Sequence, residues 1–354
     1  MSDARLTVTY AVRADRASIA ERAEALALEQ SVEVPIAAVR DARVRDEVVA
    51  RVASIAPRDD GRHDVRIAMA IETTGHEPGQ LLNMLFGNSS LHDDVELCDV
   101  ELPRDLAAAF GGPRFGIAGW RAAVGAAGRP LTCSALKPLG LPVDALASLA
   151  GTLARAGIDV IKDDHGLADQ ASAPFAARVA AVQRAIDAAN SQSGGRTIYA
   201  PSLTGSLDAM RAGIKAAREA GVGALMIAPM VSGVSTLAVV AREAGVPILA
   251  HPALAGATRI APRLLLGRLF RLFGADAETV YLQHTGSGEA IVCEGVNTLV
   301  LAQGTEPVST LEAELEDYEG EVHFIGDCLA PRTAEEAVLE GLEGADGHAE
   351  GLAL

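Results

Sequence analysis

Residues 157–166 read Gly157-Ile158-Asp159-Val160-Ile161-Lys162-Asp163-Asp164-His165-Gly166. The pattern predicts a short buried strand over residues 158–161, followed by four ionisable side chains and a glycine. A parallel α/β fold carries its catalytic and binding residues at the carboxyl ends of its strands. We therefore expect a functional site at one edge of a parallel sheet.

Lysine is scarce in this chain, because only three of its 30 basic residues are lysines: Lys137, Lys162 and Lys215. Lys137 and Lys162 each end an apolar, strand-like run. A primary amine can be carbamylated or can form a Schiff base, whereas a guanidinium cannot. This favours chemical roles for Lys137 and Lys162. The alternative is that both are ordinary strand-end lysines in surface ion pairs.

The composition sets limits on the class of protein. The chain has 354 residues, of which 49% are hydrophobic, and this length suits one large domain with a smaller one. A net charge of −17 argues against nucleic acid or an anionic membrane surface as partner. The four cysteines lack the spacing of a zinc site. Residues 221–241 are uncharged but contain proline and glycines, so we expect no membrane span and a cytoplasmic protein.

The first third of the chain mixes strand and helix patterns without regular alternation. The strand-like segments are residues 5–12, 44–55, 64–71 and 97–102, and the helix-like segments are residues 19–27 and 78–86. A polar turn over residues 57–61 separates the second and third strands. This arrangement predicts a separate α+β domain of ferredoxin-like type over residues 1–120.

A helix–glycine–strand unit repeats in the rest of the chain. Residues 153–158, 217–222 and 241–246 are near copies, and each places a glycine at the end of a helix. The candidate strands are residues 131–137, 159–162, 197–201, 224–228, 247–251, 279–283, 298–302 and 321–326. Eight strands favour a (β/α)₈ barrel of TIM type, and a GxGxxG turn typical of a dinucleotide fold is absent.

Polar residues follow several of these strands. Lys137 ends the first strand, Lys162 and His165 lie at the end of the second, and His251 ends the fifth. The carboxyl ends of barrel strands meet at one mouth, so we expect these side chains to converge. Along an extended strand Lys162 and Asp164 point to the same face, and the residue between them, Asp163, points to the other.

With Glu29, Gly87-Asn88, Lys137-Pro138 and Lys162-Asp163-Asp164 in this order, the chain resembles the large subunit of ribulose-bisphosphate carboxylase (RuBisCO). It is most similar to the RuBisCO-like proteins, which do not fix CO₂, and the resemblance covers residues 1 to about 276. It implies a carbamate on Lys162, formed with activating CO₂, and Asp164 as a metal ligand. It also implies proton transfer by Lys137.

The same resemblance implies a homodimer, in which Glu29 and Asn88 reach the active site of the neighbouring subunit. The third ligand position of the family holds His165 in place of glutamate. The implied metal is Mg²⁺, with Mn²⁺ as the alternative because an imidazole suits it better.

Other departures bear on the reaction. His251 is present as a catalytic residue, but Pro252 replaces the phosphate-binding arginine that the family places next. The loop with the carboxylation lysine is missing. We therefore expect metal-dependent enolisation of a phosphorylated keto sugar or keto acid (tautomerisation, epimerisation or decarboxylation) and not carboxylation.

The end of the chain departs further from this family. Residues 296–304 and 322–332 resemble the closing strands of the FAD/NAD(P) domain in flavin oxidoreductases of the old-yellow-enzyme and dienoyl-CoA-reductase type. The glycine-rich loops of that domain are missing, so bound FAD is not expected. We divide the barrel region into residues 121–276 and an atypical tail, 277–354. The tail predicts an irregular or incomplete barrel closure; the alternative is that it forms the last two barrel units.

Two other functions remain open. The first is an aldolase in which Lys162 or Lys137 forms a Schiff base, which requires a neutral amine. The acids beside Lys162 argue against it, since they favour the charged amine. The second is a truncated, catalytically inactive family member that serves as a binding or structural partner.

Overall fold

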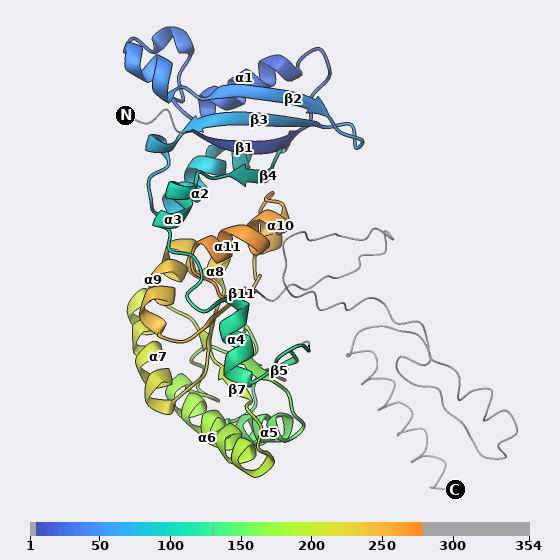
Figure 1. Ribbon diagram of the computed structural model, residues 1–354, viewed down its shortest axis with the longest axis vertical. Coiled ribbons are helices and arrows are strands. Elements are labelled where there is room, and N and C mark those ends of the chain that lie inside the picture. Colours follow the sequence, from blue (N-terminus) through green and yellow to red (C-terminus); the bar gives the residue numbers. More distant parts are fainter. Residues whose placement is uncertain (1–4, 130, 279–354) are drawn as a thin grey trace, which may run out of the picture. The chain divides into compact units, whose positions relative to one another are not determined.

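The computed structural model describes residues 5–129 and 131–278, which contain an antiparallel sheet followed by a series of parallel strands (Figure 1). No helix in these two ranges is both long and apolar enough to cross a membrane. The strand candidates at 279–283, 298–302 and 321–326, and most of the predicted tail, lie outside the described residues. The predicted boundaries at residues 120 and 276 stay predictions.

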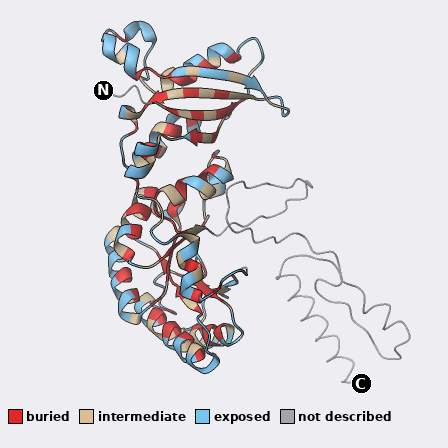
Figure 2. Cartoon of the chain, viewed as in Figure 1, coloured by how far each residue is buried: buried red, intermediate tan, exposed pale blue. Residues whose placement is uncertain are grey.

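The antiparallel sheet has the strand order β2-β3-β1-β4. Its strands are β1 (Arg5–Val12), β2 (Arg51–Pro57), β3 (His63–Ala70) and β4 (Val95–Glu101), and its longer helices are α1 (Ile19–Glu29) and α2 (Pro78–Phe86). Buried and partly buried residues alternate along β1 and β3, as Figure 2 shows. The alternation predicted for residues 5–12 is thus confirmed from Arg5 to Tyr10, whereas Ala11 and Val12 are both buried, and one face of the sheet forms core.

One predicted strand, residues 44–55, is wrong in its first half. Val44–Val48 form a single π-helical turn, and β2 begins only at Arg51. The guanidinium of Arg5 donates to the carbonyl oxygens of Glu47 (2.8 Å) and Val49 (3.2 Å). These bonds satisfy backbone groups that the end of such a turn leaves open. Because Arg5 is far away in the sequence, the local pattern could not reveal it.

The parallel strands are β5 (Cys133–Leu136), β6 (Val160–Asp163), β7 (Ile198–Ala200), β8 (Ser202–Leu203), β9 (Leu225–Ile227), β10 (Ile248–Ala250) and β11 (Ala277–Glu278). They pair in the orders β5-β6-β7 and β8-β9-β10-β11. Pro201 separates β7 from β8, since proline lacks the N–H that a continuous ladder needs. The first five predicted strands are therefore present, and β8 is an additional short strand directly after the third, which was predicted over residues 197–201. Closure into an eight-stranded barrel stays a prediction.

Helices connect the parallel strands in the predicted order. The longer ones are α5 (Val143–Arg155), α6 (Phe175–Ser193), α7 (Leu207–Ala220) and α9 (Val234–Ala244); the shorter ones are α8 (Pro229–Ser232), α10 (Pro262–Leu264) and α11 (Phe270–Leu272). Two more helices, α3 (Arg104–Ala109) and α4 (Gly116–Val124), lie between β4 and β5. Gly221 and Gly245 end α7 and α9 with φ values of 77° and 74°. The repeated glycine thus fits its predicted place, because a side chain would strain this left-handed backbone.

Residues 259–261 bind along the outer edge of β4. The Leu97 N–H donates to the Arg259 carbonyl (2.9 Å), and the Ala261 N–H donates to the Leu97 carbonyl (2.8 Å). The Arg259 guanidinium also donates to the carbonyl oxygens of His92 (2.6 Å) and Val95 (3.1 Å). The chain that follows β10 is therefore fastened to the antiparallel sheet.

Asp276 anchors the start of α4 to the parallel strands. Its carboxylate, 1% exposed, accepts hydrogen bonds from the backbone N–H groups of Phe115 (2.5 Å), Gly116 (2.7 Å) and Ile248 (2.9 Å). An unpaired buried N–H is destabilising, so all three groups depend on this one side chain.

We predict that Asp276→Ala lowers the free energy of unfolding by about 3 kcal/mol or more, because it leaves one buried and two partly buried donors without an acceptor. Urea unfolding measures the change. The control is Asp276→Asn, which keeps one acceptor oxygen and should lose less. A loss below about 1 kcal/mol for the alanine variant would contradict this account.

Candidate active site

Five polar side chains meet at the carboxyl ends of β5, β6 and β10. The Lys137 ammonium nitrogen lies 3.3 Å from Asp164 Oδ2, and His165 Nδ1 lies 3.5 Å from Asp164 Oδ1. The rings of His165 and His251 stack, with centroids 4.6 Å apart and planes inclined by 14°. The fifth side chain, Lys162, is close enough for its charge to act on both Asp164 and His251. Three segments far apart in sequence thus form one polar cluster.

Lys162 is buried at the end of β6, with only 3% of the residue exposed. Its amine donates to the Asp163 carbonyl oxygen (3.3 Å). Burial lowers the pKa of Lys162, and the attraction of Cys133 and Asp164 opposes this shift only in part. The neighbouring acids do favour the charged amine, as expected, but burial outweighs their effect. A larger neutral fraction makes the amine a better nucleophile toward CO₂ or a carbonyl.

Asp164 stays ionised although it is largely buried. Burial opposes its charge, but hydrogen bonds from the Gly166 N–H (2.9 Å) and from Lys137 outweigh that effect and lower the pKa of Asp164. Lys137 has a mostly exposed side chain, 68%, so its amine reaches the polar cluster from the solvent side. The site therefore offers a fixed carboxylate beside an accessible amine.

His251 is neutral at physiological pH. Burial, and then the positive charge of Lys162, lower the pKa of His251 to about 4. Its Nδ1 accepts a hydrogen bond from the Ala253 N–H (3.1 Å), which leaves the ring proton on Nε2. His251 can therefore donate a hydrogen bond from Nε2 to an oxygen atom without carrying a charge.

The donor set suits a hard cation only if Lys162 is carbamylated. Within residues 5–129 and 131–278, no three histidine, cysteine, aspartate or glutamate side chains converge as metal ligands would. A carbamate would add oxygen atoms beside the Asp164 carboxylate, and oxygen is what Mg²⁺ prefers. The buried amine with a lowered pKa fits this modification. His165 Nδ1, 3.5 Å from Asp164 Oδ1, would add an imidazole nitrogen donor beside that carboxylate.

Glu29 and Asn88 lie in the antiparallel layer, at the end of α1 and the start of the short helix η4 (Asn88–Leu91). The Asn88 amide donates to Glu29 Oε1 (3.1 Å). Buried Gln30 supports this pair: its amide donates to the Tyr10 hydroxyl (2.9 Å), and its Oε1 accepts from the Ser89 hydroxyl. Gln30 and Ser89 were not predicted as site residues, and their positions directly after Glu29 and Asn88 were the available signal.

A second polar group was also not predicted from the sequence. Arg178, Tyr199 and Asp163 form a wholly buried cluster on the far side of β6 from Lys162. The predicted opposite orientation of Asp163 is consistent with these partners. An arginine within the apolar pattern of α6 was the available signal in the sequence.

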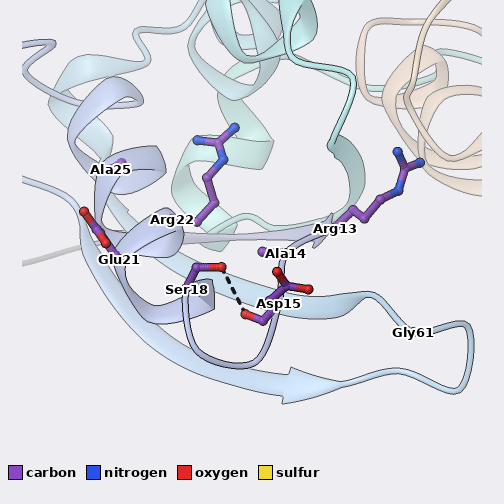
Figure 3. A pocket seen from close by; sticks show the side chains of 8 residues that line it. All are labelled: Arg13, Ala14, Asp15, Ser18, Glu21, Arg22, Ala25 and Gly61. Carbon is purple, nitrogen blue, oxygen red and sulfur yellow. Dashed lines mark hydrogen bonds between the residues drawn. The ribbon is translucent and has the colours of Figure 1, made fainter.

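A pocket lies elsewhere, at the start of α1 (Figure 3). It has a volume of about 670 Å³ and is lined by Arg13, Ala14, Asp15, Ser18, Glu21, Arg22, Ala25 and Gly61. The Arg22 guanidinium pairs with Asp94 at 2.7 Å, and Ser18 donates to the Asp15 carbonyl oxygen (3.2 Å). These groups already have partners, so we place the candidate active site at the polar cluster and not here.

Comparison with known proteins identifies the family. The sequence model of one protein family, "Ribulose bisphosphate carboxylase large chain, catalytic domain", matches residues 116–287. "Ribulose bisphosphate carboxylase-like protein 1" of Rhodopseudomonas palustris is 56% identical over 283 residues, which are 80% of this chain and 77% of that protein. The chain belongs to the RuBisCO large-chain family. The predicted resemblance is confirmed.

A further relative and a solved structure support the placement among RuBisCO-like proteins. The "5-methylthioribulose-1-phosphate isomerase" of Rhodospirillum rubrum is 54% identical over 275 residues, 77% of this chain and 74% of that protein. The crystal structure of a RuBisCO-like protein from Rhodopseudomonas palustris matches with a TM-score of 0.74 and 54% identity, over 77% of this chain and 76% of that one. The prediction of an enzyme of the RuBisCO-like group is thereby confirmed.

The resemblance predicted for the tail, residues 277–354, is not supported. The family match ends at residue 287, and the comparisons lend no support to the resemblance of the tail to flavin oxidoreductases. The predicted strands of that segment lie outside the described residues.

Proposed function

We propose that this chain is a RuBisCO-like enzyme that moves a proton next to the carbonyl group of a phosphorylated keto sugar, with 5-methylthioribulose 1-phosphate as the first candidate. The observation that carries the proposal is the cluster of Lys137, Lys162, Asp164, His165 and His251 at one edge of the parallel strands. The relative named as the isomerase of that compound supports the choice of substrate. Carboxylation is not proposed, because Pro252 stands where the family has a phosphate-binding arginine.

A carbamate on Lys162 and the carboxylate of Asp164 would hold Mg²⁺ or Mn²⁺, with His165 as the third ligand. A cation bound there would polarise the substrate carbonyl and so acidify the neighbouring C–H group. We assign the proton transfer to Lys137: its deprotonated amine takes the proton from one carbon, and the ammonium so formed returns it to the next. Neutral His251 donates a hydrogen bond from Nε2 to the substrate oxygen on which negative charge develops.

Exposed leucines beside the cluster favour a substrate with an apolar end. Leu139 is about half exposed, and its side chain lies against Gly166, 2.9 Å from where a β-carbon would sit on that glycine. Leu254, in the loop after His251, is 59% exposed and has a φ of 63°, which is uncommon for a bulky residue. A methylthio group would bury apolar surface against such side chains, whereas a second phosphate would not.

The main competing function is a Schiff-base aldolase, and the observation that favours it is the lowered pKa of buried Lys162. An inactive binding protein is the other alternative. Both are outcomes of the first experiment below.

We further propose a homodimer in which the Glu29–Asn88 pair of one protomer completes the site of its partner. Exposed apolar residues occur in the same two segments: Val34 and Ile36 follow Glu29 in the chain, and Leu91 follows Asn88. Exposed apolar groups close to one another are typical of surfaces that bind another protein. A second copy of the chain would bury them.

The first prediction concerns proton exchange. In D₂O with Mg²⁺ and bicarbonate, the enzyme should exchange a C–H proton of 5-methylthioribulose 1-phosphate, measured by ¹H NMR, and should act more slowly on ribulose 1-phosphate. Lys137→Met should slow exchange by about 100-fold or more, because it removes the proton-transfer amine. The control is Lys215→Met, since Lys215 is an exposed lysine on α7 beside Glu219.

Other results would reject this function. Wild-type enzyme that exchanges no proton of either compound would indicate the inactive binding protein. Irreversible labelling of Lys162 on borohydride reduction with the substrate would indicate the aldolase.

The second prediction concerns the metal. Lys162→Arg should abolish CO₂-dependent Mn²⁺ binding, measured by electron paramagnetic resonance, because arginine cannot be carbamylated. His165→Glu should restore an all-oxygen ligand set and tighten Mg²⁺ relative to Mn²⁺ by about 10-fold. An unchanged ratio of the two affinities would show that His165 does not bind the metal.

The third prediction concerns the shared site. Lys162→Ala and Glu29→Gln homodimers should each be inactive, because each lacks one essential group in both sites. After the two variants are mixed and the subunits allowed to exchange, roughly a quarter of wild-type activity should return, since each heterodimer has one intact site. No recovery, although subunit exchange is shown by mass spectrometry, would contradict the proposal.

A further inference from the structure

A buried ionic cluster lies behind the candidate active site. Asp163 and Arg178 are both 0% exposed, and Arg178 Nη2 donates to Asp163 Oδ2 at 3.1 Å. The Tyr199 hydroxyl donates to Asp163 Oδ1 (2.6 Å), and the Ser202 N–H donates to Oδ2 (3.0 Å). Asp163 thus joins the end of β6 to α6, β7 and β8. Its carboxylate has no room for substrate, so it has no direct part in the chemistry.

Arg178 also holds the segment that follows β6, residues 165–174, which we call the β6 loop. Its Nη1 donates to the carbonyl oxygens of Ala168 (2.9 Å) and Ala173 (2.6 Å). The loop is cross-linked within itself, because the Gln170 amide donates to the Gly166 carbonyl oxygen (2.7 Å). One guanidinium therefore fixes both the end of the strand and the loop that leaves it.

The beginning of this loop belongs to the active site. The Gly166 N–H donates to Asp164 Oδ1 (2.9 Å), and His165 stacks on His251. Displacement of the loop would move both proposed ligands at once. A buried ion pair is weak evidence for a stabilising role, because desolvation offsets much of its attraction. Placement of the loop is a role that does not depend on net stabilisation.

We propose that Asp163, Arg178 and Tyr199 are positioning residues, which hold the β6 loop so that Asp164 and His165 stay in register with Lys162. The inference rests on the metal site of the proposed function. Hydrogen-bonded partners behind metal ligands fix ligand orientation, and their loss costs about 10–100-fold in metal affinity.

The same strand supplies a matched control. Asp159 directly precedes β6, is 5% exposed, and accepts two hydrogen bonds of 2.6 Å from Arg129. The Thr132 N–H also donates to it (2.8 Å). Asp159 and Asp163 are therefore both buried aspartates paired with an arginine, at opposite ends of one strand. Only Asp163 adjoins the active-site edge.

The experiment compares Asp163→Asn, Tyr199→Phe and Asp159→Asn in the full chain. Each variant is measured without substrate, by Mn²⁺ titration in bicarbonate, by hydrogen exchange of residues 165–174 and by thermal unfolding. Asp163→Asn should weaken Mn²⁺ binding by about 10-fold or more and speed exchange in the β6 loop. Asp159→Asn should lower the melting temperature but leave the Mn²⁺ affinity and the loop exchange at their wild-type values.

Two results would overturn the inference: equal effects of the Asp159 and Asp163 variants on Mn²⁺ affinity and loop exchange, or a lower melting temperature as the sole effect of Asp163→Asn. If Asp163→Asn does not fold, the Tyr199→Phe variant tests the inference in its place, because it removes a single hydrogen bond. If the β6 loop of the Tyr199→Phe variant exchanges hydrogen at the wild-type rate, the positioning role is rejected. If wild-type protein binds no Mn²⁺, the proposed metal site is wrong. Hydrogen exchange of the β6 loop is then the one test of the inference. Absence of catalysis with normal Mn²⁺ binding would reject only the proposed reaction.

Discussion

The two-residue period of an extended strand governs the candidate active site. Lys162 and Asp164 flank Asp163 at the end of β6, so the strand sends them to one face and Asp163 to the other. On the first face, the amine and the carboxylate join Lys137 and the two histidines. On the second face, Asp163 is enclosed by Arg178 and Tyr199. A slip of one residue would exchange these faces and bury the reactive groups in the ionic cluster.

Burial gives the two faces different chemical properties. Lys162 loses contact with water without gaining a close, fully ionic partner, and its pKa falls. Asp164 is also largely buried but gains hydrogen bonds from Gly166 and Lys137, so its pKa falls too and its charge is kept. The site thus combines an amine disposed to lose its proton with a carboxylate disposed to stay ionised. That is the combination that carbamylation and binding of a hard cation require.

Long-range backbone contacts link this site to the antiparallel layer. The chain leaving His251 reaches β4 through residues 259–261, and Arg259 binds the carbonyl oxygens that follow Asn88 in the chain, including that of His92. The Glu29–Asn88 pair is held in turn by buried Gln30. Within one chain this pair lies in the antiparallel layer and not at the polar cluster. A role in catalysis therefore depends on the proposed partner subunit.

The sequence by itself determined the features that depend on neighbouring residues. It predicted the first five parallel strands, the glycine helix ends such as Gly221, and the common face of Lys162 and Asp164. Tertiary structure decided the rest, because the causes lie far apart in the chain. Residues 44–48 form a helical turn since Arg5 binds its carbonyl groups. The pKa of Lys162 falls because the strands and helices around it exclude water, an effect that outweighs the adjacent acid and that no local pattern contains.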